Sequence, residues 1–273
     1  MESEINIDEL LNIGIKKTNF KPEGEVKYGW NKKSAGVKAI DNSNIYWLRV
    51  QYRKKEYKLD KLWYGEIDSA NFSQIKKPIL INYLEWHTDT LTCRLDILEY
   101  IPFAVCSSTP HLQNDIQLSA TWLKDLKSSL ENLQEIQTER IAVRQDLISR
   151  RIQERFGDRF SPSISEWVTI HGDIHWANLT KPECWILDWE SWGLGPKGFD
   201  AAFLYCFSLL KPVFAEKIYE TFRDDLDTKD GIISQIFACA ELLRMIELYY
   251  DYPILKEPLE KHASFLIKRV IQP

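Results

Sequence analysis

The sequence of 273 residues lacks a basic excess and any long apolar run. It has 35 Lys and Arg against 40 Asp and Glu, for a net charge of −5, whereas nucleic-acid-binding proteins usually carry a basic surplus. No apolar stretch approaches the ~20 residues of a membrane-spanning helix. The first residues are acidic and contain no apolar core, so no signal peptide is expected. We therefore expect neither a nucleic-acid nor a membrane partner.

The sequence also lacks a cysteine framework. Its five cysteines are Cys93, Cys106, Cys184, Cys206 and Cys239. Their odd number, wide spacing and absence of a CxxC pair are typical of reduced thiols, not of disulfides or a zinc knuckle. This pattern predicts a cytoplasmic globular protein, for which 44% hydrophobic and 27% charged residues are ordinary values. The oligomeric state is not determined by the sequence.

The first hundred residues have the pattern of β-structure. Segments rich in β-branched and aromatic residues alternate with turn signals, at residues 25–30, 36–40, 45–51, 78–86 and 91–99. One helical stretch, residues 58–72, follows the third of them. The pattern predicts a small, mainly antiparallel sheet with one inserted helix.

After Pro102 the apolar residues recur at helical spacing. Helices are expected around residues 116–133, 147–156, 199–210, 212–225, 232–250 and 258–271, with short strands at 167–170 and 184–187. A β-rich front followed by a helical back predicts an α+β protein with two lobes, residues 1–101 and 102–273.

The chemistry-bearing stretch is HGDIHWAN, at residues 171–178, followed by LDWE at residues 187–190. Asp173 and Asn178 have four residues between them, and Asp188 follows ten residues later. Phosphoryl transfer requires a carboxylate that orients the attacking hydroxyl and takes its proton, which suits Asp173. Asn178 and Asp188 offer the hard oxygen ligands that Mg²⁺ prefers.

These two motifs resemble those of the aminoglycoside phosphotransferase and choline kinase superfamily, which read HGDxHxxN and DWE or DxD. The resemblance implies a two-lobed protein-kinase-like fold, with a small antiparallel sheet and one helix in the first lobe and a larger helical second lobe. It implies that Asp173 is the catalytic base and that Asn178 and Asp188 bind Mg²⁺. It further implies that His171 and His175 shape the loop and that Asp200 braces it from the next helix.

The resemblance also assigns residues of the first lobe to the nucleotide. The lysine that the family carries on its third strand is matched by Arg49, and Glu66 on the inserted helix is its expected partner. The segment from Glu99 to Ile101 matches the hinge that binds adenine through its backbone. Residues 31–36, with one glycine and two lysines, would form the loop over the phosphates. Arginine keeps the charge of lysine but not its compact geometry.

The implied function is transfer of the terminal phosphoryl group of ATP or GTP, with Mg²⁺, to a small hydroxyl acceptor such as an aminoglycoside, a choline-like alcohol or a sugar. Because Arg49 replaces lysine, a nucleotide-binding pseudokinase or regulatory protein without transfer activity is the alternative. A protein kinase is disfavoured because no activation segment follows Asp188.

Two other readings of the motifs are open. His171, Asp173 and His175 fit a zinc pattern, which would need further nitrogen or sulfur ligands. Residues 193–198 fit GxGxxG, but a dinucleotide-binding fold requires parallel strands afterwards, where this sequence is helical. We interpret these glycines as a tight exit from the preceding strand.

Overall fold

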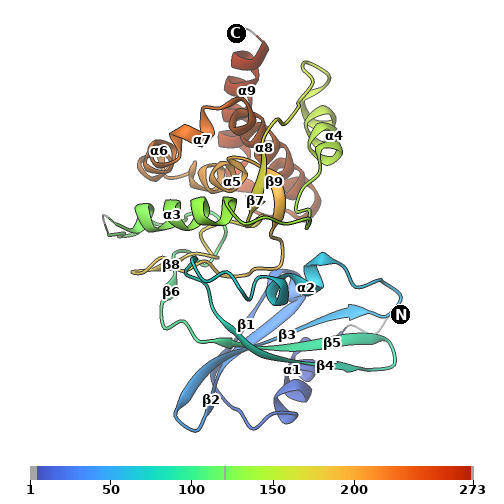
Figure 1. The fold of residues 1–273 in the computed structure, drawn as a ribbon. Coiled ribbons are helices and arrows are strands. Elements are labelled where there is room, and N and C mark those ends of the chain that lie inside the picture. Colours follow the sequence, from blue (N-terminus) through green and yellow to red (C-terminus); the bar gives the residue numbers. More distant parts are fainter. Residues whose placement is uncertain (1–4, 120, 272–273) are drawn as a thin grey trace. The chain divides into compact units, whose positions relative to one another are not determined.

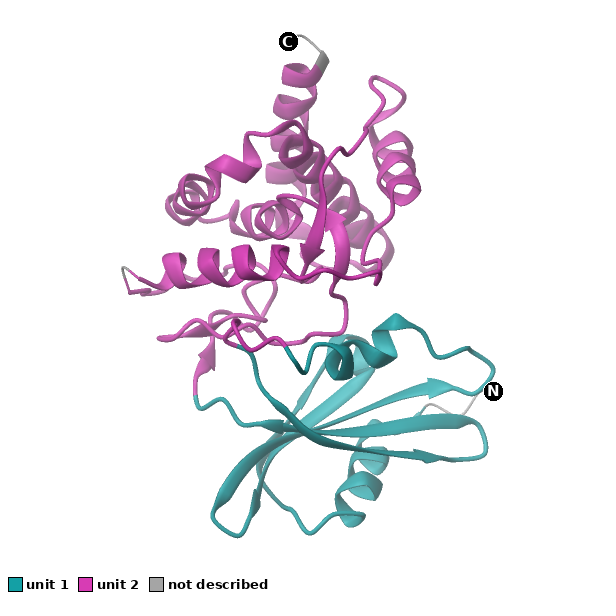
Figure 2. Ribbon diagram, in the orientation of Figure 1, with its two compact units in different colours: residues 1–71, 77–102 teal, residues 72–76, 103–273 magenta. Residues whose placement is uncertain are grey.

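The computed structural model describes residues 5–119 and 121–271 of the chain (Figure 1). These residues form two compact units (Figure 2). Unit 1 combines Met1–Asn71 with Lys77–Pro102, and unit 2 combines Phe72–Lys76 with Phe103–Pro273. Unit 1 is built on an antiparallel sheet and unit 2 is mainly helical, so the predicted α+β class is confirmed.

Unit 1 contains a five-stranded antiparallel sheet of strand order β1-β2-β3-β5-β4. Its elements are α1 (Ile7–Lys16), β1 (Lys21–Tyr28), the 3₁₀ turn η1 (Trp30–Lys32), β2 (Ser34–Asp41), β3 (Asn44–Lys54), α2 (Lys61–Asp68), β4 (Leu80–His87) and β5 (Leu91–Glu99). All five strands overlap the five predicted segments. In the central pairing, Arg49 of β3 lies opposite Asp96 of β5.

The two faces of this sheet carry different side chains. Leu48, Val50 and Leu95 belong to an apolar cluster that α1 completes with Leu10 and Leu11. Because side chains alternate along a strand, the intervening polar residues of β3 and β5 point to the opposite face. One face is thus an apolar core and the other holds a buried polar cluster.

Helix α1 is an element that the sequence analysis missed. Asn6 caps it by accepting a hydrogen bond from the N–H of Glu9, and its buried residues recur at helical spacing. The helix is ten residues long and contacts β2, β3 and β5. Both the cap at Asn6 and the apolar spacing are local signals in the sequence.

Helix α2 begins at a cap on Asp60, whose carboxylate accepts from the N–H groups of Leu62 and Trp63. The helix is shorter than the predicted 58–72, because it ends at Asp68 and Phe72 already belongs to unit 2. It buries Trp63 and Glu66.

Unit 2 consists mainly of helices. Its elements are β6 (Ala104–Val105), α3 (Trp122–Gln134), α4 (Gln145–Phe156), β7 (Trp167–Ile170), β8 (Thr180–Lys181), β9 (Gly193–Pro196), α5 (Phe199–Ser208), α6 (Pro212–Thr221), α7 (Arg223–Leu226), α8 (Lys229–Tyr249), the 3₁₀ turn η2 (Pro253–Leu255) and α9 (Lys256–Ile271). Among the described helices of the chain, none has the length and apolarity needed to cross a membrane. All five cysteines are buried and free.

The strand predicted at residues 184–187 is wrong. Only Ile186 pairs there, in an isolated bridge with Leu179. The interpretation of the glycine-rich stretch as a tight exit is also wrong, because Gly193–Pro196 forms β9, antiparallel to β7. A Cβ on Gly195 would clash with the Ile170 side chain. Glycine at this position therefore leaves room for the Ile170 side chain of the neighbouring strand.

The chain that enters β7 is held by one buried carboxylate. Asp230, in the first turn of α8, accepts hydrogen bonds from the N–H groups of Ser165 and Glu166 and from the Ser165 hydroxyl. Only 4% of Asp230 is exposed. Helix α8 thereby fixes the strand that leads into residues 171–178.

We expect Asp230→Ala to lower the free energy of unfolding by about 2–4 kcal/mol, because two backbone N–H groups and the Ser165 hydroxyl would lose their charged acceptor. The measurement is chemical denaturation of the purified protein. Asp224→Ala is the control, because that side chain is 91% exposed and surface ion pairs contribute at most about 1 kcal/mol. Equal stability of the two variants would contradict the anchoring role of Asp230.

Candidate active site

The candidate active site lies in the loop of residues 171–178, which directly follows β7. The N–H groups of His171 and Gly172 both donate to the carboxylate of Asp200, at 2.7 and 2.9 Å. Gly172 has a φ of 81°, and a Cβ there would lie 2.9 Å from the backbone oxygen of Ser191. Glycine is therefore required at this turn, and Asp200 holds the turn from the first turn of α5.

Asp173 and Asn178 are brought together across the loop. The amide nitrogen of Asn178 donates to the backbone oxygen of Asp173 at 3.0 Å and to its carboxylate at 3.2 Å. These contacts assign the amide orientation, since the nitrogen must face Asp173. The amide oxygen is then the atom that would coordinate a cation.

The carboxyl group of Asp173 lies in an acidic environment. Burial raises its pKa well above the usual value, and the charges of Asp188, Glu190 and Asp200 raise it further. The side chain still has 45% of its surface exposed. The charges of three other carboxylates thus act on the accessible oxygens of Asp173, an arrangement that disfavours further negative charge unless a cation is bound.

Asp188 is placed beside this loop by backbone contacts. The N–H of Leu187 donates to the carbonyl of Asn178 at 2.8 Å, and a ring nitrogen of His171 lies 3.1 Å from the carbonyl oxygen of Leu187. Asp188 itself has a φ of 64°. Few residues adopt this left-handed conformation, although aspartate tolerates it, and such outliers cluster at functional sites.

Asn178 and Asp188 fit a magnesium ion better than a zinc ion. Among the described residues, no three or more His, Cys, Asp or Glu side chains are grouped so that they could hold a metal, whereas zinc sites in proteins are usually completed by nitrogen or sulfur ligands. Mg²⁺ is commonly bound by one or two protein oxygen ligands, with water and substrate phosphate completing its shell. The surrounding carboxylates supply the negative field that a divalent cation would offset.

Two further residues of the loop, His175 and Trp176, have distinct environments. Burial lowers the pKa of His175 to about 4 despite the opposing charge of Asp188, so its imidazole is neutral at pH 7. A ring nitrogen of His175 lies 3.8 Å from the Asp173 carboxylate. Trp176 is fully buried and donates to the hydroxyl of Ser208 at 2.9 Å, so its ring packs the loop against α5.

A row of aromatic rings extends from the loop, and the sequence analysis did not find it. The ring of His175 lies 5.9 Å from Phe207, Phe207 lies 6.1 Å from Tyr252, and Tyr252 lies 5.3 Å from His111. Burial raises the pKa of Tyr252 to about 12, with smaller contributions from the charges of Asp251 and Asp173. These rings come from separate segments, and no local motif marks them.

Tyr252 is held in an unusual backbone conformation. Its φ is 53°, and Tyr250, two residues earlier, has a φ of 56°. Two aromatic residues in the left-handed region within one short segment indicate a conformation imposed by the surrounding structure. The ring of Tyr252 packs against the rings of His111 and Phe207, whereas Tyr250 is 84% exposed.

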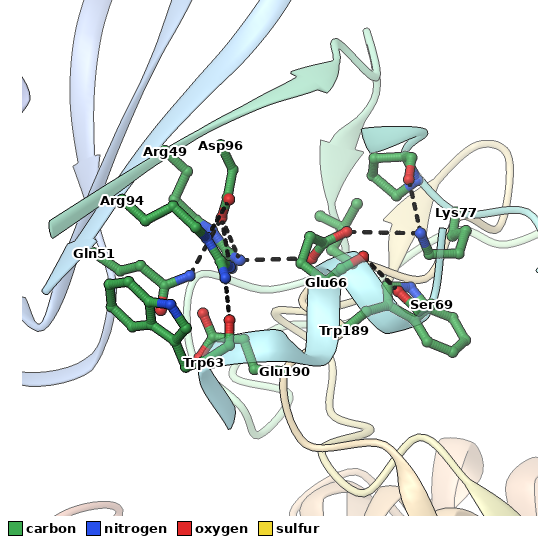
Figure 3. Close-up of polar contacts among 12 residues, drawn as sticks. Arg49, Gln51, Trp63, Glu66, Ser69, Lys77, Arg94, Asp96, Trp189 and Glu190 are labelled. Carbon is green, nitrogen blue, oxygen red and sulfur yellow. Dashed lines mark hydrogen bonds and ion pairs between the residues drawn. The ribbon is translucent and has the colours of Figure 1, made fainter. Parts of the chain in front are cut away.

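The predicted partners of the first lobe, Arg49 and Glu66, lie 3.5 Å apart across unit 1 (Figure 3). Arg49 also contacts the carboxylate of Asp96 at 3.3 Å. Asp96 in turn accepts from Arg94 at 2.6 Å and from Gln51 at 3.2 Å. Arg49 is therefore fixed between two buried carboxylates.

Lys77 is a further cation that the sequence analysis missed. Its ammonium lies 3.6 Å from the second oxygen of Glu66 and donates to the backbone oxygen of Pro78 at 3.1 Å (Figure 3). Burial lowers its pKa, while the charge of Glu66 opposes this shift. Glu66 thus contacts both Arg49 and Lys77. No spacing rule links Lys77, which precedes β4, to a residue on α2.

The remaining predicted nucleotide residues lie along the sheet. Glu99 ends β5, and its N–H donates to the carbonyl of Ile79 at 2.8 Å. Ile101 lies in the segment that follows. In the turn between β1 and β2, Lys32 lies over the ring of Tyr28 and Lys33 over that of Trp30.

No known protein family and no curated protein is matched by the sequence. Solved structures do match the fold. A thermostable mutant of aminoglycoside phosphotransferase APH(4)-Ia, in ternary complex with AMP-PNP and hygromycin B, aligns with a TM-score of 0.63 at 10% identity, over 97% of this chain and 99% of that one.

Two further structures support the same fold. Spectinomycin phosphotransferase APH(9)-Ia, in complex with ADP and spectinomycin, has a TM-score of 0.56 at 15% identity, covering 99% of this chain and 96% of that one. A putative fructosamine-3-kinase from Haemophilus somnus 129PT has a TM-score of 0.55 at 11% identity, covering 94% and 96%. The chain therefore has the two-lobed, kinase-like fold of small-molecule phosphotransferases, as its two sequence motifs predicted.

Proposed function

We propose that this protein is a magnesium-dependent phosphotransferase that moves the terminal phosphoryl group of ATP, or of GTP, to the hydroxyl group of a small molecule. The observation that carries the proposal is the convergence of Asp173, Asn178 and Asp188 in a fold shared with small-molecule kinases. AMP-PNP and ADP in the complexes of those structures favour a nucleotide donor.

In this proposal Asp173 orients the acceptor hydroxyl and accepts its proton. The hydroxyl oxygen forms a bond to the terminal phosphorus, the bond from that phosphorus to its bridging oxygen breaks, and the nucleoside diphosphate leaves. Mg²⁺, bound by Asn178 and Asp188, would neutralise charge on the phosphates. The rate gain comes mainly from positioning and charge stabilisation.

Unit 1 would bind the nucleotide. Arg49, fixed by Asp96 and Glu66, would supply the positive charge for the phosphates. Backbone groups of Glu99 and Ile101 would bind the base. A pseudokinase is the competing function, because an arginine held by two carboxylates offers less of its charge to a phosphate than a lysine held by one.

The acceptor would lie against the rings of His111, Phe207 and Tyr252, the row that leads away from Asp173. Neutral aromatic rings beside carboxylates favour an acceptor with an apolar or cationic portion. A hydroxyl-bearing amine meets both requirements, because its ammonium group is the cation and its hydroxyl group is the nucleophile. An aminoglycoside and a choline-like alcohol both meet this description.

We expect Asp173→Asn to lower kcat by about 10²–10⁴-fold, the usual contribution of a general base, with nucleotide Kd nearly unchanged. The variant retains the shape of the side chain and a partner for Asn178. The measurement is acceptor-dependent nucleoside diphosphate release with Mg²⁺, across a panel of amino alcohols, aminoglycosides and sugars. Nucleotide affinity is measured separately by calorimetry.

Asp188→Asn is the companion variant, and it should weaken Mg²⁺-nucleotide binding as well as turnover. Asparagine also tolerates a positive φ, so the backbone is preserved. Wild-type turnover by Asp173→Asn would refute its role as the base. Mg²⁺-dependent nucleotide binding without transfer to any acceptor would favour the pseudokinase.

We expect Tyr252→Leu to raise the acceptor KM by roughly tenfold, because a buried ring contact is worth about 1 kcal/mol or more, while the nucleotide KM stays constant. Tyr250→Leu is the matched control, since it carries the same change at a similar φ but its ring is exposed. Initial rates at varied acceptor concentration check both variants. Similar KM values in the two variants would contradict a role for Tyr252 in acceptor binding.

The raised pKa of Asp200 predicts that stability falls with rising pH while turnover rises. Burial raises its pKa from 3.8 to about 6, although the N–H groups of His171 and Gly172 oppose the shift. The folded protein therefore binds this proton more tightly than the unfolded chain. The contribution of Asp200 to stability is largest below about pH 4 and falls as pH rises through 6, by about 3 kcal/mol in all.

Turnover should rise as the pH rises through 6. The ionised carboxylate has two equivalent oxygens that accept the hydrogen bonds from His171 and Gly172, whereas the protonated form has one hydroxyl oxygen. Asp200→Asn should thus gain stability relative to the wild type as pH rises from 4 to 7, yet turn over more slowly at pH 7. Denaturation of both proteins across this range gives the difference. A stability difference that does not vary with pH would contradict the raised pKa of Asp200.

A further inference from the structure

Unit 2 contains a cavity of about 510 Å³ that the proposed reaction does not use. It lies among α5, α6, α8 and α9, and the residues Asp173, Asn178 and Asp188 do not line it. Helix α5 separates the two places, because Phe207 and Ser208 contact His175 and Trp176 whereas Tyr205 lines the cavity. Its volume is in the range of small-molecule sites, roughly 300–1,000 Å³.

Four of the residues that line the cavity carry aromatic rings. Tyr205 lies 4.9 Å from the ring of His262 and 6.0 Å from the ring of Tyr219. Phe265 of α9 lines the cavity with 56% of its surface exposed. Flat rings around a hollow of this size favour a planar aromatic ligand, which can stack on them.

The hydrogen bond between His262 and Gln235 determines which ring nitrogen of His262 carries the proton. The amide nitrogen of Gln235 donates to the backbone oxygens of Leu226 and Gly231, at 2.9 and 3.2 Å. Its oxygen therefore faces Nε2 of His262 at 3.1 Å and accepts a hydrogen bond from the N–H group there. Burial lowers the pKa of His262 to about 4, so Nδ1 is unprotonated at pH 7 and is a hydrogen-bond acceptor.

The charged lining residues favour a cation. Asp227 accepts from the hydroxyl of Tyr219 at 2.6 Å and lies 3.9 Å from Arg269. Glu216 of α6 adds a second carboxylate to the lining. Two acids and one arginine leave the lining with a formal charge of −1 while His262 is neutral. A cationic ligand with N–H donors complements both this charge and the acceptor on His262.

We propose that this cavity is a second, non-catalytic binding site for a small planar aromatic cation bearing N–H groups. The site is independent of phosphoryl transfer. It is formed partly by α5, the helix whose first turn carries Asp200.

Calorimetry on the full chain with tryptamine tests the proposal, and indole-3-propionate, which has the same ring system and the opposite charge, is the matched probe. We expect tryptamine to bind and the anion to bind at least about tenfold more weakly, from the combined loss of attraction and gain of repulsion. Failure of tryptamine to bind at millimolar concentration, or equal binding of both probes, would overturn the proposal.

Two variants of α6 locate the site. Glu216→Gln should weaken tryptamine binding by about three- to fivefold, the effect of a partly exposed ion pair. Glu220→Gln, an exposed glutamate of the same helix outside the cavity, should leave binding unchanged. Binding that is unaffected by Glu216→Gln, or that Tyr252→Leu weakens instead, would place tryptamine elsewhere and refute the assignment.

Discussion

Two backbone N–H groups at the start of the loop, those of His171 and Gly172, donate to one buried carboxylate, Asp200. The charge on Asp200 is expensive to bury, as its raised pKa shows, and these two hydrogen bonds offset part of that cost. The positions of Asp173 and Asn178 follow from this anchored turn. Helix α5, β7 and the loop are therefore one arrangement, which carries the proposed chemistry.

Unit 1 also buries charged side chains, and it does so in a cluster of ion pairs. Asp96 is completely buried and contacts Arg94 and Arg49. Glu66 is shared by Arg49 and Lys77. Buried ions are tolerated only when their partners are in place, so a substitution at one position affects the whole cluster. Arg49 therefore has two carboxylate partners, Glu66 and Asp96.

The helices and strands that could be predicted were those whose signal lies in contiguous residues. The composition of residues 91–99 and the turn signals around them predicted β5 with its bounds, and the helical period predicted α8 and α9 to within a few residues. The strand predicted at residues 184–187 failed because a short apolar run does not show whether a neighbouring strand exists. Pairing partners such as β7 and β9 are distant in sequence, and β9 is rich in glycine, which propensity assigns to turns.

The sequence by itself determined the α+β class, the five strands of unit 1 and the loop that holds Asp173 and Asn178, because each has a signal in contiguous residues. Only the tertiary structure decided that Arg49 is shared between Asp96 and Glu66, that Lys77 reaches Glu66, and that Tyr252 packs against His111. These contacts join residues from 11 to 141 positions apart in the sequence. They depend on how buried charges and rings find partners once water is excluded, which no local pattern encodes.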